Sequence, residues 1–157
     1  MNREETATLP MGDARFFDIL MPYEIRLAQR RTLDRSLTPG KNLPPIFTGL
    51  YLIQPVLRGA VVMPAEEDGG SEIRSTVETL IRSALRDSDI FGRLEGYRLL
   101  ALVRDLEPQH AYVVAQRMLS AFNRSEPLRE IGVGIRIGYV IYPLASQANL
   151  PPSQWPR

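Results

Sequence analysis

The sequence lacks cysteine, a strong net charge and long apolar runs, and each absence excludes a class of function. Without cysteine there are no disulfides, thiolate metal sites or cysteine nucleophile. The 19 basic and 18 acidic residues leave a net charge of +1, so no global field attracts nucleic acid or an anionic membrane. No apolar run approaches the roughly 20 residues of a membrane-spanning helix. We therefore expect a cytoplasmic protein with no nucleic-acid partner and no membrane insertion.

Histidine is almost absent as well. The only one, His110, follows Pro108 in the first turn of an expected helix, and no carboxylate or nucleophile partner for it is evident in the sequence. An exposed helix residue is therefore the favoured interpretation of His110, and a catalytic base is the less favoured one.

The chain length and the 44% hydrophobic content predict one compact domain with flanking segments. Residues 1–45 are expected to form an N-terminal helical segment, kinked or split at Pro22, followed by a proline-rich loop. Residues 46–146 form the main domain, and residues 147–157 are a proline-rich tail. In the N-terminal segment, an apolar stripe containing Phe16 and Leu20 fits either a docking surface or packing onto the domain itself.

Hydrophobic periodicity predicts the order of elements in the main domain. The expected elements are a strand at 46–56 with a short extension at 59–63, a helix from an N-cap at Ser71 to about Arg86, hairpin strands at 90–94 and 97–104, a helix from Pro108 to Phe122 that Pro127 follows, and a strand at 131–143. This order predicts an α+β fold with helices packed on a single, mostly antiparallel sheet.

Several segments of this order resemble one family. The segment DIFGRLEGYRLL at 89–100 is similar to the signature hairpin of diguanylate cyclase (GGDEF) domains, and LIRSALRDSD at 80–89 is similar to the helix end before it. AYVVAQRMLSAF at 111–122 and GVGIRIGYVIYP at 132–143 match the helix and strand that follow in that family. The resemblance covers roughly residues 46–146. It implies a palm-type, nucleotidyl-cyclase-like fold that here lacks the last helix of the family.

The same resemblance implies that the catalytic machinery has been lost. In active members, one carboxylate on the first strand and one in the hairpin hold Mg²⁺ ions that stabilise phosphoryl transfer. Gln54 stands at the strand position and Tyr97 at the hairpin position, so neither supplies a carboxylate. The full degenerate signature is Glu95, Gly96, Tyr97, Arg98 and Leu99. We therefore expect no metal, no cofactor, no catalytic residue and no synthesis of cyclic di-GMP.

A product-binding site is the part of the family pattern that survives. Arg86 and Asp89 stand at the positions of the family's inhibitory Arg-x-x-Asp site, and the resemblance implies that Arg117 completes it. An arginine that grips phosphate or guanine and a carboxylate that accepts from guanine N–H groups need no metal. The sequence thus predicts a cyclic di-GMP receptor. It leaves open a structural ion pair and cap contributing about 0–1 kcal/mol, and a protein-interaction or homodimer scaffold; an active cyclase is the least favoured alternative.

Overall fold

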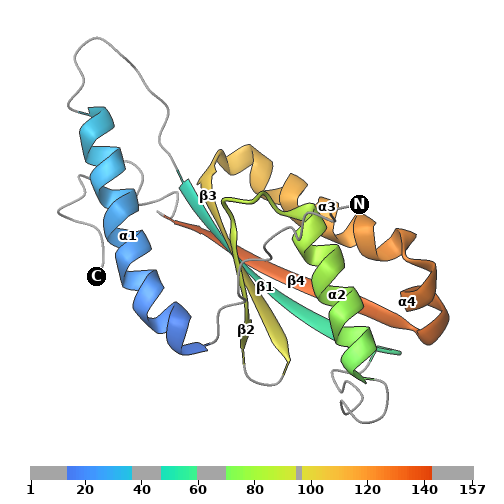
Figure 1. The fold of residues 1–157 in the computed structure, drawn as a ribbon. Helices are drawn as coiled ribbons and strands as arrows, with labels where there is room; N and C mark the ends of the chain where they lie inside the picture. Colours follow the sequence, from blue (N-terminus) through green and yellow to red (C-terminus); the bar gives the residue numbers. More distant parts are fainter. Residues whose placement is uncertain (1–13, 37–46, 60–69, 95–96, 143–157) are drawn as a thin grey trace, which may run out of the picture.

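The computed structural model describes residues 14–36, 47–59, 70–94 and 97–142 (Figure 1). The elements, in chain order, are α1 (Ala14–Ser36), β1 (Phe47–Leu57), α2 (Gly70–Ala84), β2 (Ile90–Leu94), β3 (Arg98–Leu106), the 3-10 helix η2 (Pro108–His110), α3 (Ala111–Arg124), α4 (Glu126–Ile131) and β4 (Val133–Tyr142). The predicted linker and tail fall largely on residues 37–46 and 143–157, which lie outside the described residues.

The four described strands form one sheet in the order β2-β3-β1-β4, and every neighbouring pair is antiparallel. The strands β2 and β3 form the predicted hairpin, with Leu94 opposite Arg98 at its closed end. The strand β1 lies between β3 and β4, so residues far apart in the sequence are brought side by side (Figure 1). The predicted α+β fold with a single antiparallel sheet is confirmed.

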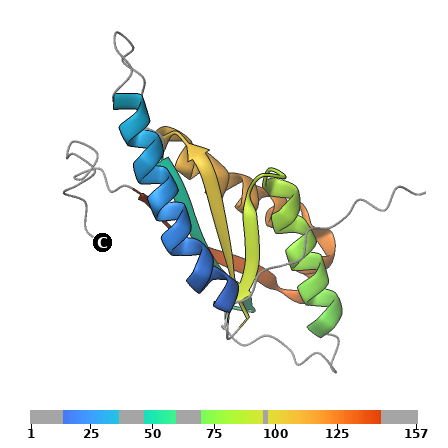
Figure 2. The same ribbon diagram turned by 60° about the vertical axis from the view of Figure 1, so that its left-hand side comes forward.

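Helices cover both faces of this sheet. The helices α2 and α3 pack on one face, where the main hydrophobic core forms, and α1 lies over the other face (Figure 2). Side chains of β1 alternate accordingly: Tyr51 and Ile53 are fully buried in the core, whereas Leu52 between them is exposed. In β3, Leu100 and Leu102 on the side of α1 are buried as well, because α1 and the core helices cover this strand from both sides.

The core helices follow the predicted spacing. In α2 the residues Val77, Ile81 and Ala84 are buried at intervals of three and four, which gives one apolar stripe toward the sheet. In α3, Met118 is fully buried, and the hydroxyl of Tyr51 on β1 donates to the carbonyl oxygen of Ala111 at 2.8 Å. This bond satisfies a buried phenol at the start of α3 and ties the helix to the sheet.

Two local expectations were wrong, and one short helix was not predicted. The first helix, expected to be kinked or split at Pro22, is not split: α1 runs without a break from Ala14 to Ser36 with the exposed Pro22 inside it. Pro127 follows the end of α3, as expected, but it also lies in the first turn of the unpredicted six-residue α4, where its missing N–H has no helical partner to lose. Gly132 caps α4 with φ 80°, so the last strand begins at Val133, two residues after the expected start at Ile131. The expected extension at 59–63 begins with a turn at Gly59, and the rest lies outside the described residues.

No helix within the described ranges is long and apolar enough to cross a membrane.

Candidate functional site

The degenerate signature lies at the turn between β2 and β3. Glu95 and Gly96 are outside the described residues, and Tyr97 follows them with φ 50°, a left-handed conformation that few non-glycine residues adopt. Arg98 is exposed at the start of β3 and Leu99 is fully buried in the core. In the described part of the signature, therefore, one residue is held in a left-handed turn, one is exposed and one is buried in the core.

Tyr97 is bound to α2 rather than open to a ligand. Its hydroxyl donates to the carbonyl oxygen of Arg74 at 3.1 Å and lies 3.3 Å from Oε1 of Glu78, and the Arg74 guanidinium stacks 4.5 Å from the ring centre. Glu78 also accepts two bonds from Arg93, at 2.5 and 2.8 Å. Burial, followed by the Glu78 carboxylate, raises the pKa of Tyr97, so the phenol is neutral.

The residues that the family resemblance points to as metal positions, Gln54 and Tyr97, do not fit a magnesium ion. Ile53 pairs with Leu99 in the core, so Gln54, the next residue on β1, points to the opposite face of the sheet from Tyr97. The Gln54 side chain donates to the carbonyl oxygen of Pro55 at 3.0 Å. A neutral amide and a neutral phenol on opposite faces cannot share a hard cation. Across the described part of the chain, no group of three or more His, Asp or Glu residues could hold a metal ion.

The three predicted ligand-binding residues line one cavity. This cavity, of about 380 Å³, lies between the end of α2, the end of β3 and the start of α3, and its lining includes Arg86, Asp89 and Arg117. Arg86 and Asp89 come from the turn after α2, and Arg117 comes from the second turn of α3. Residues separated by about 30 positions in the sequence are thus brought together around a hollow large enough for part of a nucleotide.

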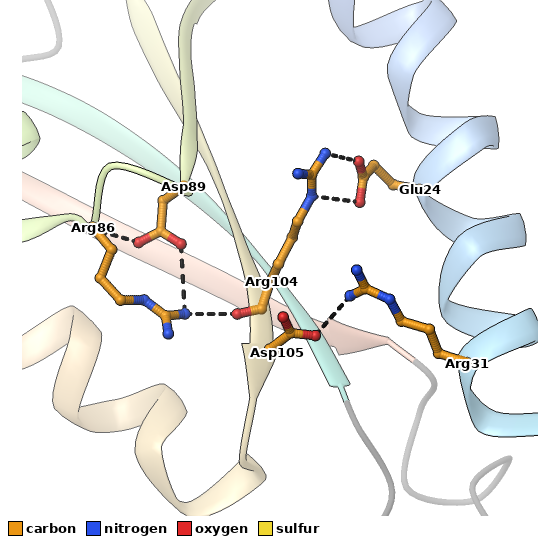
Figure 3. A network of polar contacts seen from close by, with 6 residues as sticks. All are labelled: Glu24, Arg31, Arg86, Asp89, Arg104 and Asp105. Carbon is orange, nitrogen blue, oxygen red and sulfur yellow. Dashed lines mark hydrogen bonds and ion pairs between the residues drawn. The ribbon is translucent and has the colours of Figure 1, made fainter. Parts of the chain in front are cut away.

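Arg86 and Asp89 also bind one another (Figure 3). Oδ2 of Asp89 accepts the backbone N–H of Arg86 at 2.8 Å, and the N–H of Asp89 donates to the carbonyl oxygen of Arg86 at 2.9 Å. The Asp89 side chain is only 3% exposed, and its Oδ1 lies 3.6 Å from the Arg86 guanidinium but accepts no hydrogen bond from the described residues. The cap and ion pair that the sequence left open are therefore real, and they leave one buried acceptor unsatisfied.

The Arg86 side chain reaches past Asp89 to β3. Its Nη2 donates to the carbonyl oxygen of Arg104 at 2.6 Å, yet the side chain is 53% exposed. The N–H groups on Nε and Nη1 have no partner among the described residues, so the guanidinium keeps donors for a ligand.

The cavity is also lined by polar residues that the sequence analysis did not predict as part of a site. Asp105 lies near the end of β3, Glu107 follows the strand, and His110 stands at the end of η2. His110 is exposed, as expected, but it does have a carboxylate neighbour: its Nδ1 lies 3.7 Å from Oε2 of Glu107. The spacing of three residues between Glu107 and His110 was the available signal, since it places them on one side of a helical turn.

No protein-family model matches the sequence, and no curated protein is similar to it in sequence. Solved structures do match. The GGDEF domain of PA1120 (YfiN or TpbB) from Pseudomonas aeruginosa is 17% identical with a TM-score of 0.61, over 85% of this chain and 77% of that chain. A sensory box/GGDEF family protein from Caulobacter crescentus is 13% identical with a TM-score of 0.59, over 92% of both chains.

A third solved structure carries a ligand. The GGDEF domain of DgcB from Caulobacter crescentus, in complex with c-di-GMP, is 10% identical with a TM-score of 0.56, over 90% of this chain and 80% of that chain. Identities this low are consistent with a strongly diverged sequence. Together, the antiparallel sheet, the β2-β3 hairpin and these similarities show that the chain has the fold of the GGDEF domains of diguanylate cyclases.

Proposed function

We propose that this GGDEF-fold domain is a receptor for cyclic di-GMP rather than a cyclase, with the ligand held by Arg86, Asp89 and Arg117. The observation that carries the proposal is the convergence of these three side chains on one cavity of about 380 Å³. The positions come from the family pattern, but their meeting around a hollow does not follow from sequence spacing alone. The DgcB domain of the same fold, solved with c-di-GMP, supports the ligand class.

The chemistry of the cavity suits a guanine base with an attached phosphate. The exposed guanidinium of Arg86 has donors for a phosphate oxygen or for the acceptor edge of guanine. The unsatisfied Oδ1 of Asp89 is a buried acceptor, and the N–H groups of guanine are donors that match it. Arg117 on α3 adds a second positive charge at the cavity wall. A ligand with both a phosphate and a guanine edge therefore uses the polar groups present.

The carboxylates of the cavity limit where a phosphate can lie. Asp105 is neutralised by Arg31, whose Nη1 lies 2.7 Å from Oδ1 of the aspartate. Glu107 is contacted by the side-chain amide of Gln109 at 2.6 Å and faces His110. The Glu107 side of the cavity thus keeps negative character and repels phosphate. We expect the phosphate to lie toward Arg86 and Arg117.

The absence of cyclase activity forms the other half of the proposal. A diguanylate cyclase needs metal ions at the transferred phosphate. Tyr97 and Gln54, at the family's metal positions, are neutral and point to opposite faces of the sheet. Catalysis through divergent ligands is the alternative, and detection of cyclic di-GMP after incubation with GTP and Mg²⁺ or Mn²⁺ would establish it.

The test is calorimetric titration of the purified protein with cyclic di-GMP, with GTP plus Mg²⁺ in parallel. We expect saturable binding of cyclic di-GMP alone. Arg86→Ala and Arg117→Ala should each weaken it by roughly tenfold or more, since a hydrogen bond to a charged group contributes about 1.5–3 kcal/mol. Arg124→Ala is the matched control, because this exposed arginine of α3 donates to the carbonyl oxygen of Ser120 away from the cavity. Wild-type affinity in Arg86→Ala would show that the site assignment is wrong.

A protein-interaction or homodimer scaffold is the second candidate. Leu52 and Val140 are 38% and 56% exposed, and the register that pairs Leu50 with Val140 places them on one face of β1 and β4. Exposed apolar side chains that share a face are typical of interaction surfaces. If calorimetry detects no binding of cyclic di-GMP or GTP and light scattering shows a defined oligomer, this function is favoured over the receptor.

A further inference from the structure

The C-terminal end of β3 contacts two different parts of the molecule. On one side, the side chains of Arg104 and Asp105 reach α1; on the other, the carbonyl oxygen of Arg104 accepts a bond from Arg86, and Asp105 lines the cavity (Figure 3). Two adjacent residues therefore connect the N-terminal helix to the proposed ligand site.

The contact with α1 is partly buried and charged. Glu24 is only 3% exposed, and both its carboxylate oxygens accept from Arg104: Nε donates to Oε2 at 2.9 Å, and Nη2 donates to Oε1. Arg31, two turns further along α1, pairs with Asp105 at 2.7 Å. The side chain of Gln29 donates to the hydroxyl of Tyr142 on β4 at 3.3 Å. Most of these polar anchors of α1 therefore end on the last residues of β3.

A bulge in β3 makes this double contact possible. Phe47 pairs with Leu106 and Gly49 with Val103, so between these two pairs β3 contains one residue more than β1. Asp105 takes up the extra residue with φ 53°. In a regular strand, Arg104 and Asp105 would point to opposite faces. The bulge turns Asp105 toward the same helix as Arg104, and both charges reach α1.

The bond from Arg86 supports the backbone at this bulge. Its Nη2 donates to the Arg104 carbonyl oxygen at 2.6 Å, immediately before the left-handed residue. A ligand that draws the Arg86 guanidinium into the cavity competes for the same group. The carbonyl then loses a charged donor, and the geometry that aims Arg104 and Asp105 at α1 loses a support.

We propose that docking of α1 and engagement of Arg86 by a ligand oppose one another through Arg104 and Asp105. Binding in the cavity loosens α1 from the sheet, and release of α1 strengthens binding in the cavity by the same factor, because coupling between two sites is reciprocal. The ligand half of this inference rests on the proposed function. The link between Arg86 and α1 does not, and it is tested without ligand.

The ligand-free test measures hydrogen exchange of backbone amides in α1. Arg86→Ala removes the donor to the Arg104 carbonyl, and we expect exchange in α1 to accelerate roughly fivefold or more, the lower end of typical coupling between sites, while α3 is unchanged. Arg117→Ala, at the same cavity but with no hydrogen bond or ion pair to β3 among the described residues, should exchange like wild type. Equal α1 exchange in wild type and Arg86→Ala overturns the inference, as does equal acceleration in α1 and α3 or in the Arg117 variant.

The reciprocal test measures affinity for cyclic di-GMP. Glu24→Gln weakens the docking of α1 and should bind roughly fivefold tighter or more. Asp18→Asn also replaces a carboxylate of α1 by its amide, but at an exposed position. It is the matched control and should bind cyclic di-GMP like wild type. Unchanged or weaker binding by Glu24→Gln overturns the reciprocal coupling. If wild type binds no cyclic di-GMP, the proposed function fails, and the exchange experiment still decides whether Arg86 controls α1.

Discussion

Replacing Arg104 by methionine tests whether the ion pair with Glu24 holds α1 on the sheet. The change keeps an unbranched side chain and leaves the Glu24 carboxylate, 3% exposed, without its partner. Removing one member of a buried pair costs about 3–5 kcal/mol. Because the Arg104 side chain is 30% exposed and water reaches its end of the pair, we expect the lower figure, about 3 kcal/mol. For a chain of this size, that lowers the melting temperature by roughly 6–12 °C.

Urea unfolding followed by circular dichroism measures this loss. The double variant Glu24→Met/Arg104→Met should recover most of it, since a buried pair and an apolar replacement differ little in stability. Arg31→Met is the control for an exposed pair, because Arg31 and Asp105 are 40% and 56% exposed, and it should cost at most about 1 kcal/mol. A loss below about 1 kcal/mol for Arg104→Met would refute the reasoning and show that α1 contributes little to the folded state.

Three further variants probe the core, a cap and a buried phenol. Met118→Ala removes a fully buried side chain and should lower the free energy of unfolding by about 3 kcal/mol in the same urea assay; a loss under 1 kcal/mol would mean that the core refills the space. Gly132→Ala places a side chain at φ 80° and should cost about 1–2 kcal/mol, and wild-type stability would contradict the left-handed cap. Burial, with smaller contributions from Tyr139 and Asp89, raises the pKa of Tyr51 to about 12 from 10.0. Because the unfolded chain then loses the proton first, stability should fall as the pH rises from 10 toward 12, and it should fall less in Tyr51→Phe; an identical decline in wild type and variant would contradict the shift.

Much of the fold could be predicted because it follows from local periodicity. The buried stripe of Val77, Ile81 and Ala84 and the alternation of Tyr51, Leu52 and Ile53 depend on residues close in the sequence, so the pattern appears in the sequence itself. The six-residue α4 was missed because one short turn has too few residues to establish a period.

The candidate site divides in the same way. The family resemblance pointed to all three proposed ligand residues: to Arg86 and Asp89 through the Arg-x-x-Asp pattern, and to Arg117 through its register in the following helix. Asp105 and Glu107 were not predicted as cavity residues, since their position at the cavity depends on a bulge in β3 that no local sequence motif indicates. Whether Gln54 and Tyr97 share a face was also a matter of strand register, which slips without a local signal.

The sequence by itself determined the order of the described strands and of the three longer helices, the lack of a carboxylate at Gln54 and Tyr97, and the presence of an Arg-x-x-Asp pattern, because each of these depends on neighbouring residues or on their identity. Only the tertiary structure decided that α1 lies on the sheet through Glu24 and Arg104, which are 80 positions apart, and that Arg86 donates to a backbone carbonyl of β3. Such contacts leave no trace in the sequence, since every residue has a carbonyl group and every surface arginine can form an ion pair. The partner of Arg86 and that of Arg104 are therefore fixed only when the chain folds.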